Sequence, residues 1–258
     1  MKSQVQEVER STLPRQPVEV RLPTATTESR GATLVPTGFD DLPPGRLEDI
    51  PHLSDRATPL ARMVEILGAL AGLVVASPVL MIVAIIIKRE SSGPIFFKQE
   101  RLGLNGEPFT LIKFRTFHAD AKERFPELYN YSFSDSEIKE FYFKTGDDPR
   151  ITPIGRWLRK TSLDELPNLL NVLRGDIALV GPRPQIPEML PYYKGELLKR
   201  FSVRPGLTGL AHCSGRSDLS FLHTCMLDQE YVERRSLKLD LIILWKTFVT
   251  VIKRDGAY

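Results

Sequence analysis

The chain has 258 residues, enough for one good hydrophobic core together with accessory segments. Its formal net charge of +3, with 26% charged residues, is too mild to indicate a nucleic-acid-binding protein. Its two cysteines, Cys213 and Cys225, are too few for a secreted disulfide scaffold, so a reduced cytosolic setting is the default. The N-terminal sequence MKSQVQEVER has no apolar core, so we expect no cleavable signal peptide.

Residues 1–58 are polar and rich in proline, threonine, serine and arginine, and their few apolar residues follow no sustained period. Such a composition cannot bury enough apolar surface to offset the entropy of folding. We therefore expect a disordered tail, with a regulatory or partner-binding role as the alternative.

An uncharged apolar segment, Ile66–Ile87, follows the tail and is long enough to cross a bilayer core as a helix. Basic residues lie at both of its ends, and Ser77-Pro78 lies near its middle. Pro78 cannot donate a backbone hydrogen bond and predicts a bend, while the Ser77 hydroxyl can satisfy a carbonyl that the bend frees. The residues alone allow either a spanning helix or one that breaks and returns to the same face.

Short elements are predicted after the apolar segment. Their expected extents are strands at Ile95–Lys98 and Phe109–Phe114, helices at Thr116–Tyr129 and Ile154–Lys160, and a final helix at Asp228–Lys253. Leu104-Asn105-Gly106-Glu107 is typical of a hairpin turn, and Pro153 suits the first position of the helix that follows it. The stretch Tyr131–Gly146 has mixed aromatic and acidic residues and reads as an insertion without an assigned function.

The final predicted helix has a broad apolar face that lysines and an aspartate interrupt, so it is too charged to span a membrane. It could pack into the core or lie in the bilayer interface, with Trp245 and the lysines at headgroup level. Core packing is the commoner outcome for such a helix.

The most informative stretch is Thr161–Pro184, TSLDELPNLLNVLRGDIALVGPRP. Leucines at helical spacing follow Asp164-Glu165, and Arg174-Gly175 is typical of a helix C-terminus. The acid pair has a purely structural explanation as a helix cap, either in a capping box that begins at Ser162 or with Asp164 itself as the cap. Pro167 favours the second arrangement, because it then falls in the first turn. A helix start suits a cap and a catalytic pair equally.

These residues resemble the bacterial sugar transferase family of monotopic phosphoglycosyl transferases. The resemblance covers roughly Pro59 to Tyr258, including the terminal Asp255–Tyr258. Its matching segments are Gly93–Gln99, Arg101–Gly103, Lys113–Thr116, Asp148–Thr152, Arg159–Asp176, Leu179–Pro184 and Arg204–Gly209, in the order the family has them. The chain departs from the family at His212–Arg216, so no contact from that loop is carried over. His212, Cys213, His223 and Cys225 do not have the spacing of paired zinc ligands.

The resemblance implies an α+β fold, mostly helical, in a monotopic membrane protein. Residues 59–90 would form a re-entrant membrane helix broken at Ser77-Pro78, and residues 91–258 a compact cytoplasmic catalytic domain with short strands. The protein would lie in the bacterial inner membrane, with both ends of the helix and the catalytic domain on the cytoplasmic face.

The resemblance also implies a reaction, in which a sugar-1-phosphate passes from a UDP-sugar to undecaprenyl phosphate and UMP is released. This would be the first step of exopolysaccharide or surface polysaccharide synthesis. Asp164 would be the nucleophile, through an aspartyl-phosphate-sugar intermediate, and Glu165 the Mg²⁺ ligand. The residues implied in substrate binding are Lys113, Arg115, Arg159 and Arg183 for phosphate and Arg204, Pro205 and Gly206 for the nucleotide. Neighbouring helical residues point roughly 100° apart, so one carboxylate can reach phosphorus while the other holds metal.

The expected partners are a UDP-sugar, undecaprenyl phosphate and membrane lipids, without nucleic acid, and a homodimer stays open. The alternative function is a non-enzymatic, membrane-anchored scaffold of a polysaccharide assembly complex, in which the acid pair is only a cap. A membrane-anchored nucleic-acid-binding protein is a further rival, but the chain has no recognisable reading motif. For Asp228 and Asp240, metal support and helix capping stay open.

Overall fold

The computed structural model describes residues 39–52, 58–139, 141–142, 148–215 and 219–253. These residues lie in one compact unit, Leu34–Tyr258, and are mostly helical with short strands, which confirms the expected α+β class. Most of the predicted tail lies outside the described residues, as do Arg216, the terminal Asp255–Tyr258 and part of the Tyr131–Gly146 stretch.

Residues 39–52, which belong to the predicted tail, are folded onto the rest of the unit. They contain two short 3-10 turns, η1 (Phe39–Asp41) and η2 (Leu47–Asp49). Phe39 and Ile50 are only 1% and 2% exposed and join the largest hydrophobic cluster. The expectation of disorder is wrong for this stretch, because its two widely spaced apolar side chains are enough to hold it against the core.

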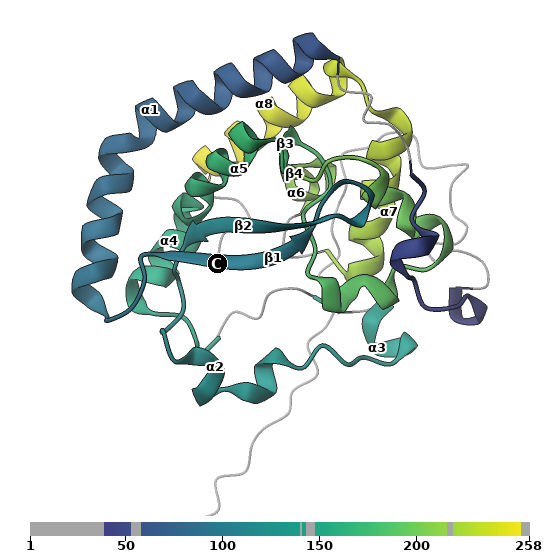
Figure 1. Cartoon of the computed structure of the whole chain (residues 1–258), viewed down its shortest axis with the longest axis horizontal. Coiled ribbons are helices and arrows are strands. Elements are labelled where there is room, and N and C mark those ends of the chain that lie inside the picture. The colour runs from purple at the N-terminus through teal and green to yellow at the C-terminus, as the bar shows by residue number, and fades with distance from the viewer. Residues whose placement is uncertain (1–38, 53–57, 140, 143–147, 216–218, 254–258) are drawn as a thin grey trace, which may run out of the picture. The chain divides into compact units, whose positions relative to one another are not determined.

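Helix α1 (Pro59–Glu90) is one continuous helix with Pro78 inside it, and Figure 1 shows it turning partway along its length. The Ser77 hydroxyl donates to the carbonyl of Val74 at 2.8 Å. That carbonyl lies four residues before Pro78 and has lost its helical donor, so the predicted role of Ser77 is confirmed. The helix is long and apolar enough to cross a membrane, and only 11% of its most apolar window is buried.

Strands β1 (Phe96–Leu102) and β2 (Pro108–Phe114) form an antiparallel hairpin. Strand β1 extends beyond Lys98, where it was predicted to end. The 3-10 turn η3 (Leu104–Gly106) joins them, with Asn105 and Gly106 both at positive φ, as the predicted turn requires. The register pairs Phe97 with Lys113 and Arg101 with Phe109, so side chains at these positions share one face of the hairpin.

The segment after the hairpin is less helical than expected. Helix α2 covers only Ala121–Arg124, followed by η4 (Pro126–Tyr129). Thr116 accepts a backbone hydrogen bond from Thr152, and His118 donates one to Arg150. This extended pairing prevents a helix from starting at Thr116, so that part of the prediction is wrong.

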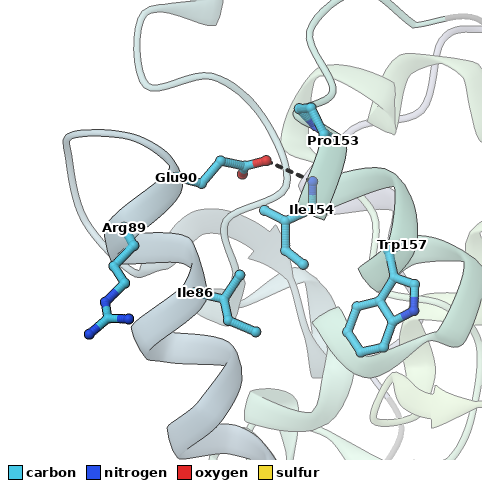
Figure 2. A pocket seen from close by; sticks show the side chains of 6 residues that line it. All are labelled: Ile86, Arg89, Glu90, Pro153, Ile154 and Trp157. Carbon is cyan, nitrogen blue, oxygen red and sulfur yellow. Dashed lines mark hydrogen bonds between the residues drawn. The ribbon is translucent and has the colours of Figure 1, made fainter.

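Two further helices precede the acid pair, α3 (Asp135–Lys139) and α4 (Pro153–Thr161). Pro153 is the first residue of α4, as predicted, and the Thr152 hydroxyl caps it by accepting from the amide of Gly155 at 2.9 Å. Glu90, at the end of α1, accepts from the amide of Ile154 at 2.8 Å and so ties α1 to the start of α4 (Figure 2).

The informative stretch folds as 3-10 helix η5 (Leu163–Asn168), helix α5 (Leu169–Arg174) and strand β3 (Ala178–Val180). Gly175 ends α5 with φ 93°, which confirms the predicted stop. Strand β3 pairs in parallel with β4 (Gly206–Thr208). A Cβ on Gly206 would lie 2.1 Å from the amide nitrogen of Gly181, so only glycine permits this approach.

The remaining elements are η6 (Pro187–Tyr192), η7 (Gly195–Ser202), α6 (Leu210–Ser214), α7 (Phe221–Arg234) and α8 (Leu237–Lys253). The predicted final helix is therefore two helices. The chain leaves helical geometry at Arg235, and the Ser236 hydroxyl accepts from the amide of Leu239 to begin α8. Helix α8 buries Ile243 against Tyr231.

Candidate active site

The acid pair lies in the 3-10 turn η5 between α4 and α5. Ser162 takes a left-handed conformation with φ 57°, ends α4, and makes no side-chain cap to η5. Neither predicted cap is therefore present, because η5 precedes α5 and the α-helix begins only at Leu169. With capping excluded, the carboxylates of Asp164 and Glu165 need another explanation.

The Asp164 carboxyl is buried, with 6% of the residue exposed. Burial raises its pKa from 3.8 to about 6, and the neighbouring Glu165 charge adds to the rise. Lys113, Arg159 and Arg183 act in the opposite direction. Asp164 is thus a carboxylate held in an environment that opposes its charge, which makes it more basic than an ordinary aspartate.

Glu165 has the opposite electrostatic character. Burial alone would raise its pKa, but Arg183, His212 and Lys113 outweigh burial and hold the pKa of Glu165 well below its usual range. Arg183 donates to Glu165 Oε1 at 2.8 Å. The pair therefore combines one basic carboxylate with one that stays ionised, and pairs of titratable groups separated in this way are typical of catalytic sites.

Three of the predicted cations lie in the electrostatic environment of Asp164. Burial and the neighbouring Arg101 lower the pKa of Lys113 to about 8. Burial also lowers the pKa of Arg159, whose Nε donates to the Thr116 hydroxyl at 3.0 Å. Arg183 is half exposed and reaches Glu165 from outside. Strands, a helix and a turn thus bring these cations around the carboxylates.

Arg101 is a member of this cluster that sequence reasoning did not assign. Burial and the charge of Arg183 lower its pKa to about 10, and its buried Nε has no hydrogen-bond partner. Arg101 lies on the same hairpin face as Lys113. The sequence could have indicated this role. Side chains alternate between the two faces of a strand, so a hairpin that turns at the predicted position places Arg101 and Lys113 on the same face.

Arg115 does not join the cluster. Its guanidinium donates to the carbonyls of Ser91 and Ser92 and to the Ser91 hydroxyl, so it holds the turn that follows α1. The expected phosphate contact from Arg115 therefore has no support in the geometry, and its buried position has a structural explanation.

Arg204, Pro205 and Gly206 also have structural explanations. Arg204 Nη1 lies 2.9 Å from Glu65 Oε2, so it binds α1. Pro205 accepts a backbone hydrogen bond from Ala178, and Gly206 belongs to β4. These contacts give the motif a structural role, in which it joins α1 to the paired strands β3 and β4.

Asp228 and Asp240 cap no helix in the structure. Asp228 forms a buried ion pair with Arg200 at 2.9 Å, and Asp240 accepts from the Tyr231 hydroxyl at 2.9 Å. Burial raises the pKa of Asp228 to about 6. Each carboxylate thus has a side-chain partner.

The donor set at the acid pair fits Mg²⁺. Asp164 and Glu165 supply hard carboxylate oxygens, and within the described residues no group of three or more His, Cys, Asp and Glu side chains comes together to form a closed metal cage. Magnesium usually takes one or two protein carboxylates and completes its shell with water and substrate phosphate. Glu165, ionised throughout the physiological range, would hold it.

Comparison with known proteins adds an independent finding. A sequence model of a family described as "Bacterial sugar transferase" matches residues 56–254. The UDP-galactose-lipid carrier transferase of Erwinia amylovora is 42% identical over 77% of this chain, and the match spans 42% of that protein. The exopolysaccharide production protein ExoY of Rhizobium meliloti is 37% identical over 76% of this chain and 87% of its own length. A UDP-glucose:undecaprenyl-phosphate glucose-1-phosphate transferase of Caulobacter vibrioides is 38% identical over 76% of this chain and 71% of its own.

Proposed function

This chain belongs to the bacterial sugar transferase family, and we propose that it transfers a sugar-1-phosphate from a UDP-sugar to undecaprenyl phosphate, with release of UMP. The product, a polyprenyl diphosphate-sugar, would begin the assembly of an exopolysaccharide or another surface polysaccharide. The names of the relatives support the substrate class, since they include a lipid carrier transferase and an undecaprenyl-phosphate transferase.

The observation that supports this reaction most directly is the buried acid pair inside a cluster of cations. Burial lowers the pKa of Lys113 and of Arg101, and the charges of neighbouring cations lower both further, so positive charge is crowded beside the acid pair. A diphosphate brings the negative charge that the cluster lacks. The basic carboxylate of Asp164 lies among these cations, where a bound phosphorus would be.

The proposed chemistry consists of two displacements at one phosphorus atom. An oxygen of the Asp164 carboxylate attacks the sugar-bearing phosphorus of the donor, the bond from that phosphorus to the bridging oxygen breaks, and UMP leaves with the electron pair. An oxygen of the lipid phosphate then attacks the same phosphorus and expels the Asp164 carboxylate. Lys113, Arg159 and Arg183 hold the phosphoryl oxygens, and Mg²⁺, when bound through Glu165, neutralises charge on the diphosphate.

We further propose that α1 enters the membrane and returns to the same face. A straight helix of 32 residues would be about 48 Å long, which exceeds the roughly 30 Å of a hydrocarbon core. Near the N-terminal end of α1, Arg62 donates to the Leu173 carbonyl at 3.1 Å and Glu65 pairs with Arg204. At the other end, Glu90 binds the amide of Ile154. Contacts from both ends to one catalytic unit favour a bent helix in one leaflet over a spanning one.

Exposed apolar side chains support the same placement. The exposed set on α1 includes Leu67, Leu70, Val74, Val75, Met81 and Ile82, and the set on α8 is Leu237, Leu241, Ile242, Trp245 and Phe248. At the end of α1, Arg89 and Trp157 lie on opposite sides of a shallow pocket (Figure 2), and both residue types are common at headgroup level. The active site would then lie at the height of the lipid phosphate.

The reaction is tested by UMP release from detergent-solubilised enzyme with a panel of UDP-sugars, Mg²⁺ and undecaprenyl phosphate. We expect release with at least one donor, and we expect Asp164→Asn and Glu165→Gln to abolish it. The alternative, a non-enzymatic scaffold, predicts no release with any donor from protein that is shown to be folded. Release that survives Asp164→Asn would leave an enzyme but remove the covalent mechanism.

The topology is tested by cysteine labelling in a background that carries Cys213→Ser and Cys225→Ala. Glu48→Cys and Ser92→Cys place single thiols at exposed positions before and after α1. A membrane-impermeant reagent should label both from the cytoplasmic side only. Labelling from opposite sides would establish a spanning helix and remove the re-entrant proposal.

A further inference from the structure

The turn that carries Arg183 has few backbone N–H groups with which to form hydrogen bonds of its own. Its sequence, Gly181-Pro182-Arg183-Pro184, contains two prolines, which have no N–H to donate. Arg183 is 49% exposed at its side chain and meets Glu165 from solvent. The position of its guanidinium therefore depends on how firmly the rest of the molecule holds the turn.

Side chains from distant elements bind the carbonyl just before this turn and the last two carbonyls within it. The Tyr231 hydroxyl donates to the Val180 carbonyl at 3.1 Å, Arg200 Nη2 to the Arg183 carbonyl at 2.7 Å, and Arg101 Nη1 to the Pro184 carbonyl at 3.0 Å. The amide of Gly206 donates to the Pro182 carbonyl at 2.8 Å. The turn is thus fixed from the hairpin, from η7, from β4 and from α7.

Arg200 is the more deeply buried of the two charged donors, since only 3% of it is exposed. Its side chain and that of Asp228 are each 2% exposed, and they form an ion pair at 2.9 Å. Its Nη1 donates to the Tyr193 hydroxyl, and its guanidinium lies 4.7 Å from the centre of the Tyr193 ring. The hydrogen bonds to Tyr193 and to the Arg183 carbonyl orient the guanidinium, and Asp228, whose Oδ2 makes no hydrogen bond, holds it there by charge.

A buried ion pair is a poor way to gain stability, because desolvation of two charges offsets most of their attraction. Asp228 shows this cost, since burial raises its pKa even beside Arg200. Arg200, one member of this pair, binds the carbonyl of Arg183. A role in positioning Arg183 therefore explains the pair better than a gain in stability.

We propose that Arg200 and Asp228 are positioning residues that set where the Arg183 guanidinium lies against Glu165 and the donor phosphate. The proposal rests on the function proposed above for the Asp164–Glu165 site. Asp228 orients Arg200, Arg200 binds the Arg183 carbonyl, and Arg183 acts on the substrate; neither Arg200 nor Asp228 touches the reacting atoms.

The test is a double-mutant cycle in kcat/KM between Asp228→Asn and Arg183→Ala in the full chain. If Asp228 acts through Arg183, we expect Asp228→Asn to lower kcat/KM about 10- to 100-fold in the wild-type background and to have almost no effect when Arg183 is already alanine. Losses that multiply in the double variant would overturn the proposal.

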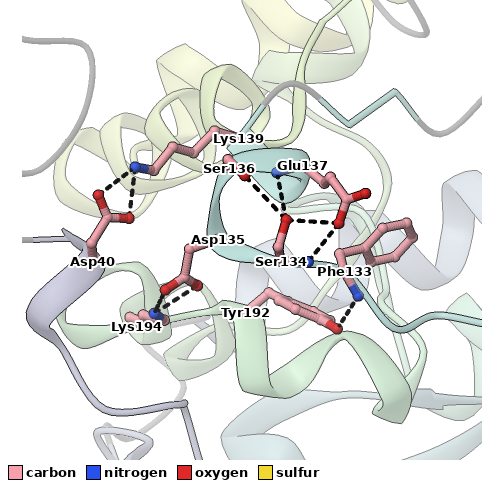
Figure 3. A network of polar contacts seen from close by, with 9 residues as sticks. All are labelled: Asp40, Phe133, Ser134, Asp135, Ser136, Glu137, Lys139, Tyr192 and Lys194. Carbon is pink, nitrogen blue, oxygen red and sulfur yellow. Dashed lines mark hydrogen bonds and ion pairs between the residues drawn. The ribbon is translucent and has the colours of Figure 1, made fainter.

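A matched control comes from another ion pair of the same region. Lys194, at the start of η7, pairs with Asp135 at 2.8 Å, and Figure 3 shows this pair beside the Asp40–Lys139 pair. Neither Lys194 nor Asp135 donates to the turn. Asp135→Asn makes the same chemical change at a carboxylate that is 42% exposed, so it should lower the unfolding temperature only slightly while kcat/KM stays within about twofold. A loss as large as that of Asp228→Asn would indicate a general effect of instability.

Hydrogen exchange separates this proposal from the proposed reaction. Amides in a peptide covering residues 178–186 should exchange about tenfold faster in Asp228→Asn than in the wild type, whether or not turnover is found. In Asp135→Asn the exchange rate of the same amides should equal that of the wild type. Unchanged exchange in Asp228→Asn would overturn the positioning role. Tyr193→Phe, which removes only one acceptor from Arg200, gives a milder variant for both measurements if Asp228→Asn fails to fold. Absence of UMP release from the wild type would instead refute the proposed reaction alone.

Discussion

Replacing Asp164 with asparagine should stabilise the fold at neutral pH and abolish transfer at the same time. Burial, with help from the Glu165 charge, raises the pKa of Asp164 from 3.8 to about 6. A tenfold change in proton affinity corresponds to about 1.4 kcal/mol, so the ionised carboxylate costs the folded state up to about 3 kcal/mol at pH 8. Asparagine has nearly the same shape without the charge.

The pH dependence of this gain follows from the raised pKa. A carboxyl whose folded pKa lies above its unfolded value destabilises the fold when it is ionised, and the cost disappears below the unfolded value. The advantage of Asp164→Asn should therefore be about 3 kcal/mol at pH 8, fall to roughly half at pH 5, and vanish below about pH 3.8. Thermal unfolding in detergent at several pH values measures it.

Asp148, a carboxylate whose pKa is lowered and not raised in the folded state, provides the control. Burial opposes the charge of Asp148, but hydrogen bonds from Arg150 outweigh burial and lower its pKa. Asp148→Asn should therefore destabilise the fold at neutral pH. If Asp164→Asn also proves destabilising at pH 8, or if its effect does not change with pH, the carboxylate serves the fold and our explanation of it is refuted.

Three further predictions concern the cations. UMP release should follow a bell-shaped pH profile, rising through about 6 as Asp164 loses its proton and falling through about 8 as Lys113 loses its charge; a flat profile between pH 5 and 9 would contradict these roles. Arg115→Lys should lower the unfolding temperature, because it loses hydrogen bonds to Ser91 and Ser92, yet leave the KM for the donor within about twofold in steady-state assays. Arg101→Gln should raise that KM about tenfold and Arg101→Lys much less, since lysine keeps the charge; equal KM values for the two variants would exclude a charge effect.

The sequence predicted helix ends and turns correctly where neighbouring residues determine them. Pro153 begins α4, Gly175 ends α5, and the turn at Leu104–Glu107 joins the hairpin, because each needs only residues within the turn itself. Ser77 repairs the helix at Pro78 for the same reason. These features lie within a few residues of the cause.

The errors occur where distant contacts decide. The segment after Thr116 has a helical pattern but pairs with residues 150–152 in extended form. Residues 39–52 have a disordered composition but insert Phe39 and Ile50 into the core. The predicted final helix breaks at Arg235. The one local indication of this break is Ser236, which can cap a new helix.

The candidate site shows the same division. Motif resemblance selected Asp164 and Glu165, and the structure gives the two carboxylates opposite electrostatic environments that no pattern could specify. Resemblance alone could not separate Arg183, which reaches Glu165, from Arg115, which holds a turn. Their roles depend on where each side chain ends, and this is a tertiary property.

The central claim is that Asp164 forms a covalent intermediate, and trapping that intermediate tests it most directly. Enzyme would be incubated with Mg²⁺ and the active UDP-sugar donor, labelled in the phosphate next to the sugar, without any lipid phosphate. We expect about one UMP released and one label bound per enzyme, cleavable by hydroxylamine as an acyl phosphate is, and no label on Asp164→Asn. Turnover that needs the lipid phosphate before any UMP appears, with no label on the protein, would mean direct transfer and contradict the account.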